Sequence, residues 1–225
     1  RLQFKNSEHL FSTISARPFP AVTSAKALSG YAAEYPHEMI RVSILADQAI
    51  AHQVDLLGSG LVDLGDEIDW HKDYKTGHSW PVRFFRDIDY NNLDQPSDVK
   101  FPWELSRFQW LIPVGQAYLL TGEERYAEFM RNLINNWREA NPYAQGVNWA
   151  CTMEVALRTV TLTWLYKVFS ISESWSKGDF RSDLLVLIYL HAHFTQHHLE
   201  RSSVNGNHYT ANAVGLVFAG QFFGQ

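Results

Sequence analysis

The sequence contains few cysteines and few charges, and each shortage removes a class of protein. Cys151 is the single cysteine among 225 residues, so the chain forms no internal disulfide, although this does not identify its compartment. Charged residues make up 19% and the formal net charge is −5, with no run of one sign. This distribution argues against nucleic-acid and membrane-surface binding. We also expect no membrane span, because polar residues interrupt every long apolar stretch.

Aromatic residues, in contrast, are abundant. They make up 14% of the chain, with 8 Trp, 10 Tyr and 14 Phe, and hydrophobic residues reach 46%. Rings in such number either fill a core or line a groove. The length favours a single domain over residues 1–225. We divide it into an N-terminal helical part (1–54), a long loop region (55–100) and helical hairpins (101–225).

Helical periodicity dominates most of the chain. The clearest pattern covers residues 123–139, whose apolar positions follow i, i+3, i+4, i+7, i+8 and i+11 from Tyr126 to Trp137. Further helices are expected at 33–53, 103–120 (kinked by Pro113), 149–170, 180–200 and 207–224. Residues 54–100 are rich in Gly and Asp, which predicts a long loop with up to two short strands.

The polarity of these helices alternates along the chain. Segments 123–139 and 180–200 are amphipathic, whereas 149–170 and 207–224 are apolar or small on most sides, as in buried helices. This alternation predicts an all-α fold of the (α/α) toroid type, with inner and outer helices in hairpins. Because helical pattern still runs through VGLVFAGQFFGQ, we expect part of a longer protein and an incomplete toroid.

Polar residues gather where the two apolar helices begin. Asn148 and Trp149 precede one, and Asn207 and His208 precede the other, so the toroid would bring all four toward one cavity. Each asparagine could instead simply cap its helix. The two interpretations are compatible, because an amide that caps with its oxygen still has an NH2 group to offer a ligand.

Glu154 and Arg158 lie four residues apart on the otherwise uncharged helix 149–170. This is the favourable order for a structural ion pair. The functional alternative is that Arg158 binds a substrate carboxylate while Glu154 orients it.

Two further groups of residues are weaker candidates. His193 and His197 have i, i+4 spacing but no neighbouring glutamate or third ligand, so we expect no metal site. In the loop region, Trp70, His71 and Trp80 are candidates for the rim of a substrate groove, with ordinary turn or solvated positions as the alternative.

The chain resembles the N-terminal domain of heparinase II/III-like polysaccharide lyases, a group that includes alginate lyases. Four motifs over roughly residues 55–225 carry this resemblance: IDWHKDYKTGHSWP, KFPWELSRFQWLIPVGQAYLLTGEERYAEFM, NPYAQGVNWACTMEVALRTVTLTW and NGNHY. It implies an (α/α) toroid followed, in full-length members, by a β-sandwich that this chain does not include.

The resemblance also implies a site. Asn207 and His208 match an active-site pair in which the asparagine helps to neutralise a uronate carboxylate and the histidine assists. The family's catalytic tyrosine and a further histidine would fall beyond Gln225, so Tyr209 is not assigned that role. Some members have an asparagine at the position of Gly206, which leaves the exact substrate open.

The implied reaction is β-elimination. The C5 proton of a uronic acid becomes acidic once its carboxylate is neutralised, and a Tyr or His base then removes it. The reaction needs no metal or organic cofactor. The implied partner is an acidic polysaccharide, in the periplasm or outside the cell, and the sequence indicates no oligomeric state.

Two other functions stay open. A glycoside hydrolase of the (α/α) toroid type needs two opposed carboxylic acids, for which Glu104, Glu154, Asp66 and Asp69 are available. A non-catalytic polysaccharide-binding domain would use the same groove without the later tyrosine.

Overall fold

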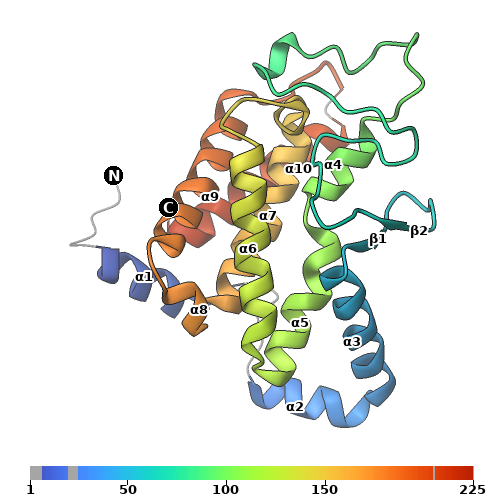
Figure 1. Ribbon diagram of the computed structural model, residues 1–225. Helices are drawn as coiled ribbons and strands as arrows, with labels where there is room; N and C mark the ends of the chain where they lie inside the picture. The colour runs from blue at the N-terminus through green and yellow to red at the C-terminus, as the bar shows by residue number, and fades with distance from the viewer. Residues whose placement is uncertain (1–6, 20–24, 205, 225) are drawn as a thin grey trace.

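The computed structural model describes residues 7–19, 25–204 and 206–224, and this part of the chain is mainly helical (Figure 1). The α-helices are α1 (Ser7–Ala16), α2 (Ala25–Glu34), α3 (Pro36–Ile50), α4 (Lys100–Ser106), α5 (Ile112–Thr121), α6 (Glu124–Ala140), α7 (Thr152–Phe169), α8 (Glu173–Ser176), α9 (Phe180–His197) and α10 (Asn207–Phe223). Short 3-10 helices are η1 (Phe85–Asp87), η2 (Gln109–Leu111) and η3 (Val147–Trp149). None of the helices in the described ranges is long and apolar enough to cross a membrane.

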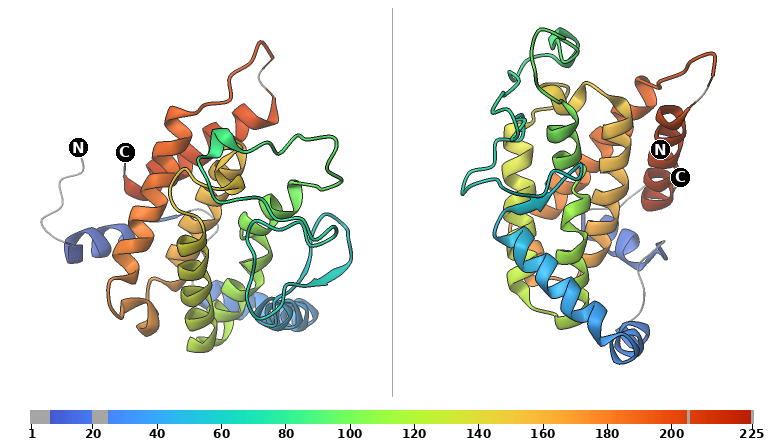
Figure 2. Two further views of the ribbon diagram at one scale, coloured as in Figure 1. Left: turned by 45° about the horizontal axis from the view of Figure 1, so that its top comes forward. Right: turned by 90° about the vertical axis from the view of Figure 1, so that its right-hand side faces the viewer.

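The helices form two layers, as the alternating polarity predicts. Helices α3, α5, α7 and α10 are successive neighbours, while α6 packs on α5 and α9 packs on both α7 and α10 (Figure 2). The six longer helices predicted from periodicity are all present, with the segment 103–120 divided between α4 and α5. Helices α1, α2 and α8 were not predicted individually, because they are only 10, 10 and 4 residues long.

Helix α7 is buried on nearly every side, as expected for an inner helix. Helix α10 is not, so the expectation for 207–224 is wrong for the described structure. Its one packed face meets α7 so closely that a Cβ on Gly215 would lie 2.8 Å from Cβ of Ala156. Val214 and Val217 on the other face are 39% and 66% exposed, because no described element covers them.

The break between α4 and α5 also differs from expectation. Phe108 adopts a left-handed backbone conformation (φ 62°), which ends the helical path before Pro113. Pro113 then lies in the first turn of α5, where its missing N–H costs no helical hydrogen bond. The proline therefore starts a helix and does not kink one.

The loop region contains the two short strands that the sequence indicated. Strands β1 (Gln53–Asp55) and β2 (Leu61–Asp63) pair in antiparallel register, with Val54 opposite Val62. Beyond them the loop is tied to the helices, since Nε1 of Trp70 donates to Oδ1 of Asn136 on α6 at 2.7 Å. Asp73 closes a second tie by accepting from the backbone N–H of Asp98.

Candidate functional site

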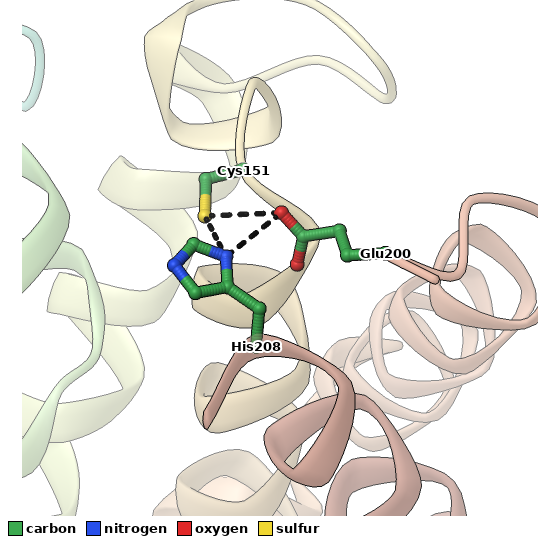
Figure 3. Close-up of side chains that lie close together, drawn as sticks. All are labelled: Cys151, Glu200 and His208. Carbon is green, nitrogen blue, oxygen red and sulfur yellow. Dashed lines mark hydrogen bonds and ion pairs between the residues drawn. The ribbon is translucent and has the colours of Figure 1, made fainter. Parts of the chain in front are cut away.

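Three side chains from separate segments meet at the start of α10 (Figure 3). Nδ1 of His208 lies 3.0 Å from Oε1 of Glu200, and Sγ of Cys151 lies 3.7 Å from the same oxygen and 3.9 Å from Nδ1. Cys151 immediately precedes α7, Glu200 follows α9, and His208 is in the first turn of α10. The toroid packing of α7, α9 and α10 thus assembles the cluster.

Glu200 is held in place from both sides. Its Oε2 accepts a hydrogen bond from the backbone N–H of Met153 at 2.7 Å, at the start of α7. Asn212 of α10 accepts from the backbone N–H of Glu200 at 2.8 Å and donates its amide to Oε2 at 3.3 Å. The carboxylate therefore joins the beginnings of two helices in one fixed geometry.

Asn207 lies beside this cluster and is exposed. It is the first residue of α10, the N-cap position belongs to Gly206, and no side chain caps the helix. The capping interpretation is therefore wrong for Asn207. Among the described residues, its Nδ2 makes one long contact, 3.8 Å to Sδ of Met153, so the amide has donor capacity for a ligand.

An open depression of about 370 Å³ adjoins the pair. Its lining is largely polar and comes from the segment that joins α9 to α10: Glu200, Arg201, Ser202, Val204, Gly206, Asn207 and His208. The backbone N–H groups at the start of α10 and the exposed Arg201 favour a negatively charged ligand, whereas the Glu200 carboxylate in the same lining is bound by His208 and by the N–H of Met153.

A match to a protein-family model shows which family this chain belongs to. The model described as "Heparinase II/III N-terminus" matches residues 33–225. The chain belongs to this family. Two relatives named heparin-sulfate lyase are similar to this heparinase II/III chain, one from Bacteroides stercoris (27% identity over 180 residues) and one from Pedobacter heparinus (25% over 185).

These matches cover 71% and 80% of the chain but only 23% and 24% of the relatives, so the chain spans about a quarter of their length. A solved heparinase III structure has a TM-score of 0.69 at 22% identity and covers 97% of this chain and 32% of its own. The heparan sulfate lyase HepC from Pedobacter heparinus has a TM-score of 0.61 at 25% identity and covers 80% of this chain and 25% of its own. These two solved structures, together with the two helical layers of the chain, confirm the predicted all-α toroid fold.

In this heparinase II/III chain, Asn148 and Trp149 do not join Asn207 and His208 at the surface. Both residues belong to η3, and their side chains are buried. The amide of Asn148 donates to the carbonyl of Trp70 and to Oδ1 of Asn141, both at 2.8 Å. Direct substrate contact is not supported, because the donors are already used inside the protein. Capping is not supported either, because the buried Oδ1 of Asn148 accepts no hydrogen bond from the described residues.

Glu154 and Arg158 form different partnerships from the predicted i, i+4 pair. Glu154 is buried and binds Arg107 of the α4–α5 connection through both carboxylate oxygens, at 2.5 and 2.8 Å. Arg158 is also buried and donates to the carbonyls of Ser106 and Asn148. This geometry corrects the expectation that Arg158 is available for a substrate carboxylate.

His191 is buried on α9 and pairs with Arg158, a contact that the sequence did not predict. Nε of Arg158 donates to its Nε2 at 2.8 Å, while Nδ1 faces the carbonyl of Leu187 at 2.8 Å. Burial and the positive charge of Arg158 hold the pKa of His191 well below 6.5. The arginine and the neutral imidazole therefore work as a structural pair, sandwiched against Trp137 and Trp149.

The loop candidates Trp70, His71 and Trp80 are buried, so an exposed groove rim is not supported by their positions. Nε2 of His71 lies 3.0 Å from the carbonyl of Ala140, and its ring packs so closely on Gly146 that any Cβ there would collide with it. Trp70 and His71 attach the loop to the C-terminal part of α6, whereas Trp80 packs in a small apolar cluster with Ile88, Val99 and Val147.

The histidines on α9 form no metal-ligating group in the described ranges. The rings of His193 and His197 lie 4.2 Å apart, and Nδ1 of His197 faces the carbonyl of His193. Cys151 and Glu200 were absent from the predicted site, because nothing local in the sequence relates positions 151, 200 and 208. Burial and the nearby Glu200 raise the pKa of the Cys151 thiol to about 12, so the free side chain carries its proton.

Proposed function

We propose that this chain supplies the carboxylate-binding half of the active site of a polysaccharide lyase, which cleaves a uronic-acid polymer by β-elimination. The observation that carries the proposal is the exposed Asn207–His208 pair beside an open depression, in a chain of the heparinase II/III family. Because the chain spans about a quarter of its relatives' length, the activity is proposed for the longer protein.

Neutralising the uronate carboxylate is the first task. The uncommitted NH2 group of Asn207 donates to it, at the positive end of the 17-residue helix α10. Donors aimed at developing negative charge contribute about 3–4 kcal/mol each to the stability of a transition state. With its carboxylate neutralised, the substrate can lose the C5 proton and form an enolate-like intermediate.

His208 performs the second task. The Glu200 carboxylate accepts a hydrogen bond from Nδ1–H, which leaves the lone pair of the neutral imidazole on Nε2. That nitrogen can accept the C5 proton from a sugar bound in the depression. Glu200 thus serves as a positioning residue, since it selects the tautomer and the direction of the ring.

The tyrosine implied by the family resemblance completes the reaction by protonating the departing O4 oxygen. We assign it to a later helix of the longer protein and not to Tyr209. The 225-residue chain alone is therefore expected to bind acidic oligosaccharides without turning them over.

The relatives' names point to a first substrate for testing. Two of them are named heparin-sulfate lyase, so we propose a sulfated or unsulfated uronic-acid polysaccharide of that kind. An extracellular polysaccharide reaches a bacterial enzyme outside the cytoplasm, which supports a periplasmic or secreted protein. The exposed Arg201 in the depression suits either a second carboxylate or a sulfate.

A glycoside hydrolase is less well supported. Glu200 is the one carboxylic acid among the described residues that line the depression, and Glu104 and Glu154 are both bound to Arg107. Hydrolysis needs a second, opposed carboxyl group about 5–10 Å away.

The product distinguishes these functions. The longer protein, incubated with heparan sulfate, is expected to release oligosaccharides with an unsaturated uronate, which absorbs in the near ultraviolet. Chain shortening without that absorbance would indicate hydrolysis. Binding without any shortening would indicate a carbohydrate-binding domain.

A further inference from the structure

Cys151, Glu200 and His208 have the geometry of a transition-metal site. Their ligand atoms (Sγ, a carboxylate oxygen and a ring nitrogen) all lie within 4.8 Å of one another, so the three residues could hold one metal ion together. A tetrahedral zinc ion with ligand bonds of about 2.0–2.3 Å requires ligand–ligand separations of about 3.4–3.6 Å. The observed separations are 3.0, 3.7 and 3.9 Å, so shifts of roughly half an ångström would accommodate the ion.

The three side chains converge on a common point (Figure 3). Two of them, Glu200 and His208, line the open depression, which provides a path for an ion, while Cys151 is buried next to them. The carboxylate of Glu200 is already fixed by Met153 and Asn212. Such outer partners orient metal ligands and strengthen binding.

The ligand types select the metal. One thiolate, one imidazole and one carboxylate match Zn²⁺ or Co²⁺, whereas Mg²⁺ and Ca²⁺ prefer oxygen ligands alone. We infer that Cys151, Glu200 and His208 form a Zn²⁺-binding site with three protein ligands, whose fourth position faces the depression.

Binding replaces protons with the metal. Zn²⁺ takes the place of the thiol proton of Cys151, which leaves as H⁺. It also bonds to Nδ1 of His208, whose proton is released while Nε2 takes one up, so that one proton is released overall. The imidazole remains neutral but now carries its hydrogen on Nε2.

This change has a consequence that rests on the proposed function. With Nε2 protonated, His208 has no lone pair for the C5 proton of a sugar. Zn²⁺ is therefore expected to inhibit the lyase reversibly, and a chelator is expected to restore it.

Cobalt spectroscopy tests the site without reference to activity. The 225-residue chain, first treated with a chelator, is titrated with Co²⁺ and then with Zn²⁺. We expect one equivalent of Co²⁺ to produce a thiolate-to-cobalt charge-transfer band in the near ultraviolet, and one equivalent of Zn²⁺ to remove it. Excess Mg²⁺ should leave the band unchanged.

Variants identify the ligands. Cys151→Ser should abolish the charge-transfer band, and Glu200→Gln should weaken Co²⁺ binding by about 10–100-fold or more. The matched control is His193→Ala with His197→Ala, which removes the histidine pair of α9 and should leave the band and the affinity intact. Circular dichroism of each metal-free variant verifies that it is folded.

Absence of the charge-transfer band in the folded wild-type chain, or its persistence in Cys151→Ser, overturns the inference. A band without lyase activity in the longer protein would leave the metal site standing and refute the proposed function. Lyase activity that is unaffected by bound Zn²⁺ would refute the inhibitory consequence alone.

Discussion

Oε1 of Glu200 lies 3.0 Å from Nδ1 of His208, and the backbone N–H of Met153 holds the other oxygen of the same carboxylate at 2.7 Å. One acidic residue between α9 and α10 thereby ties the beginning of α7 to the histidine at the beginning of α10. The proposed chemistry of His208 depends on this link, because it determines which ring nitrogen carries the hydrogen.

Replacing Glu200 should therefore impair catalysis more than folding. In the longer lyase that we propose, Glu200→Gln is expected to lower kcat by about 10–100-fold, since a glutamine amide can donate to Nδ1 as well as accept from it and no longer selects one tautomer. KM should change less. Glu139→Gln, an exposed substitution on α6, is the matched control and should retain full activity. Equal kcat for Glu200→Gln and wild type would refute the positioning role.

Removing Arg158 should destabilise the fold. Arg158→Met leaves the acceptors of His191, Ser106 and Asn148 unpaired in the interior, which costs about 3–5 kcal/mol of unfolding free energy. Urea denaturation measures this loss of unfolding free energy. The control, Arg138→Met, removes only a partly exposed ion pair with Asp183 and should cost less than about 1 kcal/mol. Similar costs for both variants would contradict the structural role of Arg158.

The stability of the chain should fall in mild acid. His191 accepts from Arg158 and cannot take a proton in the fold, and burial holds its pKa well below 6.5. The unfolded chain binds that proton below about pH 6.5, so it holds more protons than the native state there and stability declines as pH drops. Burial lowers the pKa of His71 in the same direction.

Thermal unfolding between about pH 7 and pH 5 tests whether stability falls as the pH drops. His191→Gln should reduce the pH dependence, whereas His197→Gln, on the exposed side of α9, should preserve it. A pH dependence unchanged by His191→Gln would show that another group is responsible.

Much of the fold could be predicted from the sequence, because the strongest signal is local. The apolar period from Tyr126 to Trp137 predicts α6 to within one residue at each end. The break at Phe108 could not be predicted in this way, since a left-handed conformation at a phenylalanine has no glycine or proline to mark it.

The candidate site was harder to predict, because its contacts join segments that are far apart in the sequence. Glu154 has Arg158 at helical spacing, yet it binds Arg107, which comes close only after α4 and α7 pack together. Asn207 and His208 could be proposed from their place at the start of an apolar helix and from the family motif, whereas Glu200 and Cys151 join them only when three separate segments meet. Burial of Asn148 likewise depends on a distant segment, since its amide donates to Trp70 of the loop region, and Trp149 is buried against rings of α6 and α9.

The contact between α7 and α10 gives a further prediction. Gly215→Val should destabilise the chain by about 1–3 kcal/mol, because its side chain would push against the backbone and Cβ of Ala156. Gly30→Ala in α2 is the matched control: open space surrounds it, and the change should stabilise by about 0.5–1 kcal/mol. A neutral Gly215→Val would show that α10 packs on α7 more loosely than described.

The central claim is that Asn207 and His208 recognise the carboxylate of an acidic sugar. Calorimetric titration of the 225-residue chain with a uronate oligosaccharide, and with the same oligosaccharide after reduction of its carboxyl groups to alcohols, tests it most directly. We predict that carboxyl reduction and Asn207→Ala each weaken binding by about tenfold or more, and that their effects do not add. Asn132→Ala, an exposed change on α6, should have no effect. Equal affinity of the chain for the acidic and the reduced oligosaccharide would contradict the claim.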